Sequence, residues 1–153
     1  MGSKPLKMGA NMEQKQVKIS LLSRRLSAEN SEQIKQKITG FLSENGGNWN
    51  ISWEELPSSG LGRTQTVLTL CPSGVIMTKT GEIEAKMVFR QGKSNHFTYK
   101  TPYGSIPMTL HAQTVAYQAS EAGGEVTLTY SLAMDSAHPD QLKFTLIFTP
   151  APQ

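Results

Sequence analysis

The stretch Tyr99-Lys-Thr-Pro-Tyr-Gly104 decides the interpretation of the chain, because it has the composition of a tight turn between two β-strands. Proline fixes φ at about −65°, so Pro102 suits the first corner of the turn and Gly104 its exit. A residue before proline prefers extended backbone, so Thr101 continues the first strand up to the turn. The tyrosines on either side predict a turn that is pinned to the surface beneath it.

Alternation of apolar and polar residues extends from this turn through most of the chain. The alternating runs are separated by glycine-containing turns such as Gly46-Gly47, Pro72-Ser-Gly74 and Ala122-Gly123-Gly124. Sequential hairpins of this kind form a meander, and a long meander closes to protect its edges. We therefore predict an all-β fold, an antiparallel up-and-down β-barrel of about 8–10 strands. Residues 1–14 lack the alternation and are interpreted as a disordered leader, and residues 15–150 as the single barrel domain.

The segment from Ser31 to Ser43 fits two structures. Ile34, Ile38 and Leu42 have the spacing of one helix face, with Ser31 as a candidate cap. The same residues also fit the inward positions of a strand. Gly40 inside the segment disfavours a helix. Periodicity alone leaves both structures open.

Length and cysteine content limit the class of protein. A chain of 153 residues can bury a core without disulfides or metal. The single cysteine, Cys71, cannot form an internal disulfide, which favours a reducing compartment such as the cytoplasm. No apolar run reaches the roughly 18 residues of a membrane helix, and no secretory signal follows the N-terminal lysines. We therefore expect no membrane partner.

The basic residues are concentrated near the start of the chain. Met1 to Lys37 contains eight Lys and Arg against three Asp and Glu, whereas the remainder has seven against nine. An excess confined to a leader and the first strands is weak support for nucleic-acid binding, so nucleic acid is not expected as the main partner. Arg24 and Arg25 are adjacent in a predicted strand and face opposite sides. One of them can face the interior, and the sequence does not decide which.

A set of spaced residues carries a family resemblance. The set is Ile51-Ser-Trp-Glu-Glu55, Gly62 with Thr64 and Thr66, Thr80-Gly81, Met87-Val-Phe89 with Gly92, Tyr99-x-Thr-Pro-Tyr-Gly104, and Gly124 leading to Tyr130. The pattern covers roughly Val17 to Phe148 and resembles the YwiB-like family, small bacterial proteins with a calycin-like β-barrel related to lipocalins. The resemblance implies a strand across Ser31–Ser43 and a cytoplasmic bacterial setting, but no activity. It also implies arginine in place of Lys79, and lysine binds planar anions less well.

Patterns for catalysis or metal binding are weak. Glu54 and Glu55 are adjacent in a strand, so they face opposite sides and cannot act on one substrate. His96 and His111 could share one edge of a hairpin, but they lack a recognisable ligand spacing. Cys71 has no histidine near it in the sequence. We therefore expect no enzymatic activity, no cofactor and no metal.

The predicted interior combines Met, Leu, Phe and Tyr with a few polar groups, which fits either a packed core or a ligand cavity. We predict that the chain binds a small apolar or amphipathic ligand inside the barrel. The candidate ligand-binding residues are Trp53, Arg63, Met87, Phe89, Arg90, Tyr99, Tyr103, Met108 and Tyr130. Arg63 and Arg90 would bind the carboxylate or phosphate of an anionic ligand. The alternative is a solid barrel that contacts protein or RNA through its outer surface or its basic N-terminal segment. In either case we expect a monomer or a homodimer.

Overall fold

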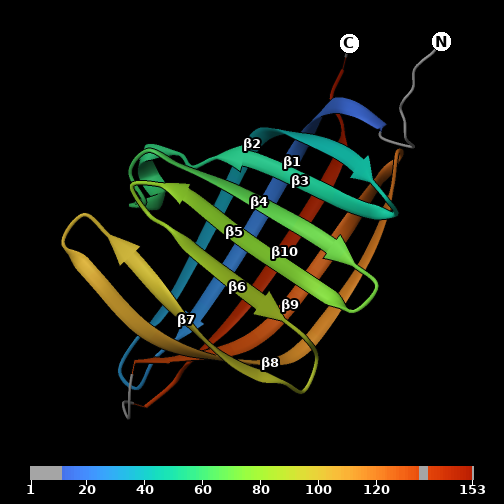
Figure 1. Cartoon of the computed structure of the whole chain (residues 1–153). Coiled ribbons are helices and arrows are strands. Elements are labelled where there is room, and N and C mark those ends of the chain that lie inside the picture. The colour runs from blue at the N-terminus through green and yellow to red at the C-terminus, as the bar shows by residue number, and fades with distance from the viewer. Residues whose placement is uncertain (1–11, 135–137, 153) are drawn as a thin grey trace.

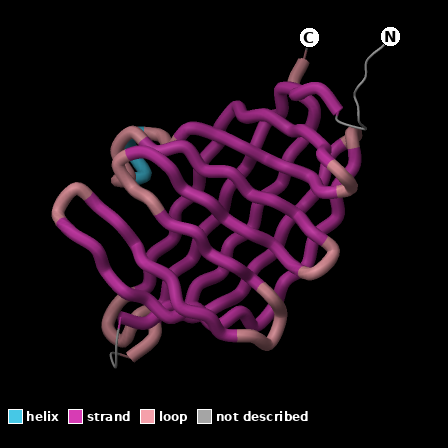
Figure 2. The backbone as a smooth tube through the Cα atoms, in the orientation of Figure 1, coloured by secondary structure: helices cyan, strands magenta, loops and turns pink. Residues whose placement is uncertain are grey.

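A computed structural model of the chain, which describes residues 12–134 and 138–152, consists almost entirely of β-strands (Figures 1 and 2). The strands are β1 (Met12–Leu26), β2 (Ser31–Asn45), β3 (Asn48–Glu54), β4 (Thr64–Cys71), β5 (Gly74–Gly81), β6 (Ala85–Phe89), β7 (Ser94–Thr101), β8 (Gly104–Ser120), β9 (Gly123–Met134) and β10 (Asp140–Pro150). A single 3₁₀ turn, η1 (Pro57–Ser59), follows β3 in the described part of the chain. The predicted leader falls almost entirely outside the described residues.

The strands form one antiparallel sheet in the order β6-β5-β4-β3-β2-β1-β10-β9-β8-β7. Strands that follow one another in sequence pair, with the exception of β6 and β7, and a ladder from Val17–Pro150 to Leu26–Gln141 joins β1 to β10 (Figure 1). β6 and β7 stand at the two ends of the order, and a backbone bridge between Glu84 and Lys100 connects them. The predicted all-β antiparallel barrel is therefore confirmed. It is nearly closed, with a seam between β6 and β7.

Side-chain and turn contacts explain where the seam lies. The side-chain Nδ2 of Asn95 donates to the Val88 carbonyl at 2.7 Å and so links β7 to β6. The amide of Gly92 donates to the Ala112 carbonyl at 2.8 Å, and the amide of Ala112 donates to the Lys93 carbonyl at 3.0 Å. The turn after β6 is thus attached to β8, so β7 begins against β8 rather than against β6.

The segment that fitted both a helix and a strand is a strand. β2 pairs with β1 from Ser31 opposite Leu26 to Leu42 opposite Lys15. Leu42 is completely buried and Ile38 is 9% exposed on the inner face. The strand implied by the family resemblance is confirmed, because the even-numbered residues of this segment face the barrel interior.

The barrel is packed solid at the end where β1 begins and β10 finishes. Its inward side chains there are aliphatic or aromatic and almost fully buried: Val17, Ile19, Leu42, Ile51, Leu68, Leu70, Val75, Phe89, Val126, Leu128, Leu146 and Phe148. The register of β8 against β9 shifts between Ala112 and Thr114, which marks a β-bulge. The extra residue lets Ala112 before the bulge and Val115 and Tyr117 after it pack on the same core.

The turn between β7 and β8 forms as predicted, but it is not pinned. The Thr101 hydroxyl accepts the Tyr103 amide and donates to the Gly104 carbonyl, both at 3.0 Å. Tyr103 is 99% exposed, because the corner residue of this hairpin has no neighbouring strand beneath it. The expectation that both tyrosines hold the turn down is therefore wrong for Tyr103. Tyr99, on β7, faces the interior.

Gly40 provides a test of the close approach between β2 and β3. A methyl group there would overlap the Ser52 carbonyl oxygen and Cδ1 of Ile19. We expect Gly40→Ala to lower the free energy of unfolding by about 2–3 kcal/mol in urea titrations, because overpacking forces backbone shifts. The exposed Gln33 of the same strand gives a control, and Gln33→Ala should change stability by about 0.5 kcal/mol or less. Wild-type stability of Gly40→Ala would contradict the described approach.

Candidate ligand-binding cavity

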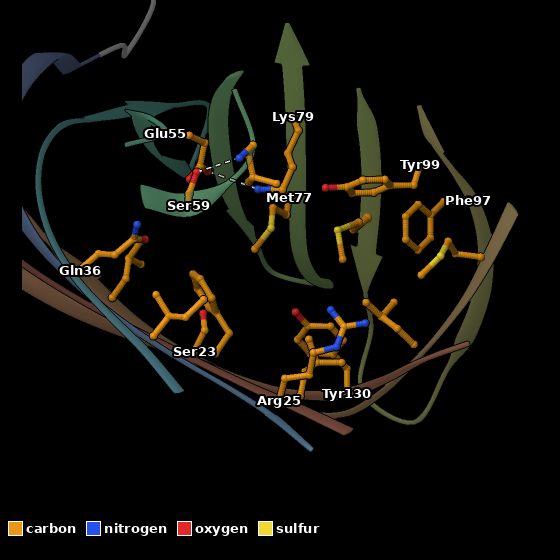
Figure 3. Close-up of a pocket in the computed structure, with 18 of the residues that line it drawn as sticks. Ser23, Arg25, Gln36, Glu55, Ser59, Met77, Lys79, Phe97, Tyr99 and Tyr130 are labelled. Carbon is orange, nitrogen blue, oxygen red and sulfur yellow. Dashed lines mark hydrogen bonds and ion pairs between the residues drawn. The ribbon is translucent and has the colours of Figure 1, made fainter. Parts of the chain in front are cut away.

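A cavity of about 430 Å³ lies inside the barrel, at the end away from the packed core (Figure 3). It arises because the inward positions change character along the strands. β1 presents apolar side chains as far as Leu21 and then Ser23 and Arg25, and β5 changes from Met77 to Lys79. Polar and flexible side chains fill the interior less completely than the aliphatic ones. The volume falls within the roughly 300–1,000 Å³ of small-molecule sites.

Most of the cavity wall is apolar. The apolar lining comprises Leu21, Trp53, Leu61, Met77, Met87, Phe97, Ile106, Met108, Leu132 and Phe144, with Ile34, Met134 and Leu142 added toward the mouth. Met77 lies opposite Met87 on adjacent strands, and Met108 lies opposite Met134. Methionine is unbranched and polarizable, so four such side chains let the wall adapt to ligands of different shape. Met134 and Ile34 are 50% and 45% exposed, so the mouth presents apolar surface to solvent.

A buried polar network forms one side of the cavity. Oε2 of Glu55 accepts hydrogen bonds from Trp53 Nε1 at 3.1 Å and from the Thr66 hydroxyl at 2.5 Å. Lys79 Nζ lies 3.4 Å from the same oxygen and donates to the Thr66 hydroxyl at 3.1 Å (Figure 3). The side chains of Glu55 and Lys79 are only 5% and 12% exposed. A buried pair of opposite charges with several additional hydrogen bonds is held in one geometry and has little net charge.

Lys79 has a perturbed pKa. Burial lowers the pKa of the Lys79 ammonium, and the charge and hydrogen bond of Glu55 oppose this shift. Desolvation disfavours the charged form of a lysine, whereas a nearby carboxylate favours it. The pair therefore depends on both partners, and removal of either would leave a charge without its counterion.

Arg25 supplies the second polar group of the cavity. Its Nε donates to Asp140 Oδ2 at 2.7 Å, and its Nη2 lies 2.6 Å from the same oxygen. This contact orients the guanidinium while Nη1 remains available for another acceptor. Arg25 is the inward member of the arginine pair, because Leu21, Ser23 and Arg25 all line the cavity. Figure 3 shows its guanidinium beside Tyr130.

Two tyrosines complete the polar lining. Burial raises the pKa of Tyr130 to about 12, with the charge of Arg25 opposing the shift. Burial also raises the pKa of Tyr99; the negative charge of Glu55 adds to the effect, and Arg25 again opposes it. Both phenols therefore remain protonated donors at neutral pH. Among the described residues neither hydroxyl has a hydrogen-bond partner, and the buried Nε2 of Gln36 likewise has none.

Five of the nine sequence-predicted ligand-binding residues line this cavity, namely Trp53, Met87, Tyr99, Met108 and Tyr130. Phe89 lies below it in the packed core, completely buried, with its ring 4.9 Å from the Tyr130 ring in an edge-to-face contact. Phe89 thus forms the floor under Tyr130 rather than part of the lining.

The other three predicted residues lie outside the cavity. Arg63 is exposed because it directly precedes Thr64, which faces inward, so its own side chain faces outward. Arg90 is exposed for the same reason after the inward Phe89. Tyr103 is the exposed corner of the β7–β8 turn. The assignment of Arg63 and Arg90 as anion-binding groups of the interior is therefore wrong.

The predicted ligand-binding residues do not include Glu55 and Lys79, which face the cavity, and the sequence left open which of Arg24 and Arg25 faces inward. Strict continuation of the alternation would have found Glu55 and Lys79. Glu55 follows the inward Trp53 at a spacing of two, and Lys79 follows Met77 at the same spacing. Charged residues that continue an apolar alternation mark the hollow part of this barrel.

The two histidines of the β7–β8 hairpin and Cys71 each contact neighbouring residues of the sheet. Nδ1 of His96 is 2.9 Å from the Thr109 hydroxyl, and Nδ1 of His111 is 2.7 Å from the Ser94 hydroxyl. Within residues 12–134 and 138–152 there is no group of three or more His, Cys, Asp or Glu side chains that could hold a metal ion. Cys71 is half-buried, and its carbonyl accepts a hydrogen bond from Tyr117. The helical content of the same residues includes no segment long and apolar enough to cross a membrane.

The fold and the cavity define a class, the nearly closed antiparallel β-barrels with a packed end and a hollow end. Residues 19–146 match the model of a family described as a domain of unknown function, DUF1934, and the chain belongs to this family. The crystal structure of the ywiB protein from Bacillus subtilis is similar, with a TM-score of 0.84 and 17% sequence identity over 94% of this chain and 96% of that chain. At this identity the likeness concerns the fold. A search of curated proteins found no match.

The Glu55–Lys79 pair predicts an asymmetry between single and double variants. Lys79→Met leaves a buried carboxylate without its cation, and we expect the free energy of unfolding to fall by about 3–5 kcal/mol. Adding Glu55→Gln removes the charge but keeps an acceptor for Trp53 and Thr66, so the double variant should recover much of that loss in urea unfolding. If Lys79→Met is as stable as the wild type, the Glu55–Lys79 pair is not buried as described.

Tyr130 predicts a pH dependence of stability. Its folded pKa of about 12 lies above the ordinary 10.0, so the folded state holds the proton more tightly than the unfolded state. The stabilisation is complete below about pH 10 and is lost as the pH rises toward 12, by about 2–3 kcal/mol in total. From about pH 9 to 11, urea unfolding should therefore show a steeper loss of stability for the wild type than for Tyr130→Phe. Parallel curves of stability against pH for the two proteins would contradict a buried Tyr130 phenol. Titration of Lys79 affects both proteins equally, so it cancels in the comparison.

Proposed function

We propose that this protein binds a small amphipathic molecule that carries an anionic group, inside the open end of the barrel. The observation that carries the proposal is the combination of an apolar cavity of about 430 Å³ with hydrogen-bond donors that lack protein partners. Small-molecule sites are mostly apolar and use a few convergent polar groups to orient the ligand. This cavity has both features.

Arg25 is the group best placed to bind the anionic end. Its contact with Asp140 uses Nε and Nη2, which fixes the plane of the guanidinium and leaves Nη1 available for a ligand oxygen. The hydroxyl of Tyr130 and that of Tyr99 supply neutral donors in the same electrostatic environment, because the charge of Arg25 acts on both phenols. A carboxylate or phosphate at this position would accept several hydrogen bonds at once.

The apolar part of the ligand would contact the methionine-rich wall. Met77 and Met87 are nearly buried, and Met108 and Met134 continue the wall toward the mouth. Thioether side chains change conformation at low cost, so the wall can bind apolar ligands of different shapes. We therefore expect a range of related ligands to bind.

We propose binding without catalysis. Glu55 and Lys79 are the strongest acid–base candidates, but each is engaged by the other and by Thr66, so neither is placed to transfer a proton.

We also propose a cytoplasmic location, which the lone Cys71 supports.

The adjacent arginines provide a matched test of this function. A fluorescent fatty-acid probe should bind the wild-type protein and be displaced by decanoate. Arg25→Gln should weaken decanoate binding at least about tenfold, because a charge-assisted hydrogen bond is lost, whereas Arg24→Gln on the outer face should leave it unchanged. Decanol, which lacks the anion, should bind both variants equally.

Two outcomes would reject the proposal. One is the absence of probe binding, and the other is an equal loss of decanoate binding in Arg24→Gln and Arg25→Gln. A cavity-filling variant, Leu132→Trp, locates the site: retained probe binding in a folded Leu132→Trp protein would place the ligand outside the cavity.

A further inference from the structure

The outer surface of the barrel carries a basic stripe on three adjacent strands. We define this stripe by five exposed residues, Lys18 and Arg24 on β1, Lys35 and Lys37 on β2, and Lys143 on β10. All five side chains belong to outward positions, because the inward positions of these strands line the core or the cavity. In Figure 1 the three strands run side by side behind the green strands. The stripe is independent of the cavity and of any ligand in it.

The stripe has no internal counterions. We consider the outward positions of β1 from Lys18 to Leu26 and the positions of β2 and β10 that pair with them. These positions hold only basic, hydroxyl, amide or apolar side chains. In the described part of the chain none of the five cations forms an ion pair, whereas Arg25 and Lys79 on the inner face both do. The charge of the outer face is therefore available to an external anion.

One pair within the stripe is unfavourable for folding. Arg24 lies directly opposite Lys143 in the register of β1 and β10. Like charges at directly opposed positions of adjacent strands destabilise a sheet. The arrangement is thus a cost to stability that an external anion would remove.

A hollow in the outer face lies among the cations and hydroxyl groups. It is lined by Lys18, Lys37, Ser20, Thr39 and Thr149, with Ile147 at its side. Two ammonium groups and three hydroxyls are donors suited to phosphate oxygens. Phe41, 43% exposed, stands two residues from Thr39 on the same face of β2 and offers a surface on which a base can stack.

We propose that this basic stripe binds the phosphate backbone of single-stranded RNA, with Phe41 stacking against one base. From Lys18 to Arg24 the stripe follows β1 for six residues, or about 20 Å at the rise of a strand, which suits a linear polyanion. A membrane surface fits less well, because the exposed large apolar side chains beside the stripe are limited to Phe41, Ile147 and Leu26 among the described residues. The net charge of +3 does not show this feature, since acidic residues elsewhere in the chain mask it.

Fluorescence anisotropy with a labelled oligouridine tests the proposal on the full chain. The wild type should bind at low salt, and log K should fall with log salt with a slope of about −3, as expected for four to five phosphate contacts. Lys18→Gln/Lys37→Gln should reduce the slope by about 1.4 and weaken binding. The matched control, Lys86→Gln/Lys100→Gln, removes two exposed lysines beside the seam, on strands distant from β1 in the sheet order, and should bind like the wild type.

Two further variants separate RNA binding from general attraction to anions. Phe41→Ala should weaken oligouridine binding at least about fivefold and leave heparin binding unchanged, because heparin has no bases. Lys143→Gln should weaken oligouridine binding while raising stability in urea. Absence of binding at low salt, an equal loss in the Lys86→Gln/Lys100→Gln control, or stronger binding to phosphatidylglycerol vesicles than to oligouridine would each overturn the proposal.

Discussion

The two-residue period of the β-strand is the constraint on which this structure depends. Every second side chain faces the interior, so the identity of the inward residue at each level decides whether the barrel is filled or hollow. Aliphatic residues such as Leu68 and Leu146 pack that interior at one end. At the other end the inward positions pass to Arg25, Glu55 and Lys79, and a cavity results.

Charged residues inside a barrel must be compensated, and the compensation shapes the cavity. Glu55 and Lys79 neutralise one another, and Trp53 and Thr66 bind the same carboxylate oxygen. Arg25 is compensated by Asp140 at the start of β10. The interior therefore has little net charge but retains directed donors, which suits a ligand that brings its own acceptor groups.

The seam between β6 and β7 shows how a nearly closed barrel can omit one ladder. The bridge at Glu84 and Lys100 and the Asn95 side chain hold the two strands together. Because the turn after β6 is bonded to Ala112 of β8, the strand β7 is positioned by β8. Closure of the sheet comes instead from the pairing of β1 with β10, which joins the two ends of the chain.

The fold could be predicted from the sequence because alternation and turn residues are local signals. The strand assignment of β2 needed the family resemblance, since Ile34, Ile38 and Leu42 satisfy helical and strand periods equally. The candidate cavity was predicted only in part. The apolar character of a residue such as Tyr130 or Met87 predicts that it lines the cavity. The positive charge of Arg63 and Arg90 suggests an anion-binding role, but the alternation of the strands directs both side chains outward.

Some features have no local signal. The Asp140 contact with Arg25 joins residues from the two ends of the chain, and the bulge in β8 depends on the facing residues of β9. The basic stripe likewise combines three strands, one of which comes from the C-terminal end of the chain. Such arrangements depend on register, which sequence patterns alone do not fix.

The most direct test of a ligand cavity uses the methionine methyl groups. Four of the seven methionines, Met77, Met87, Met108 and Met134, line the cavity. In a ¹³C-methyl NMR titration with decanoate, we expect the resonances of the four cavity methionines to shift. Unchanged cavity resonances at a saturating concentration of decanoate would contradict this expectation.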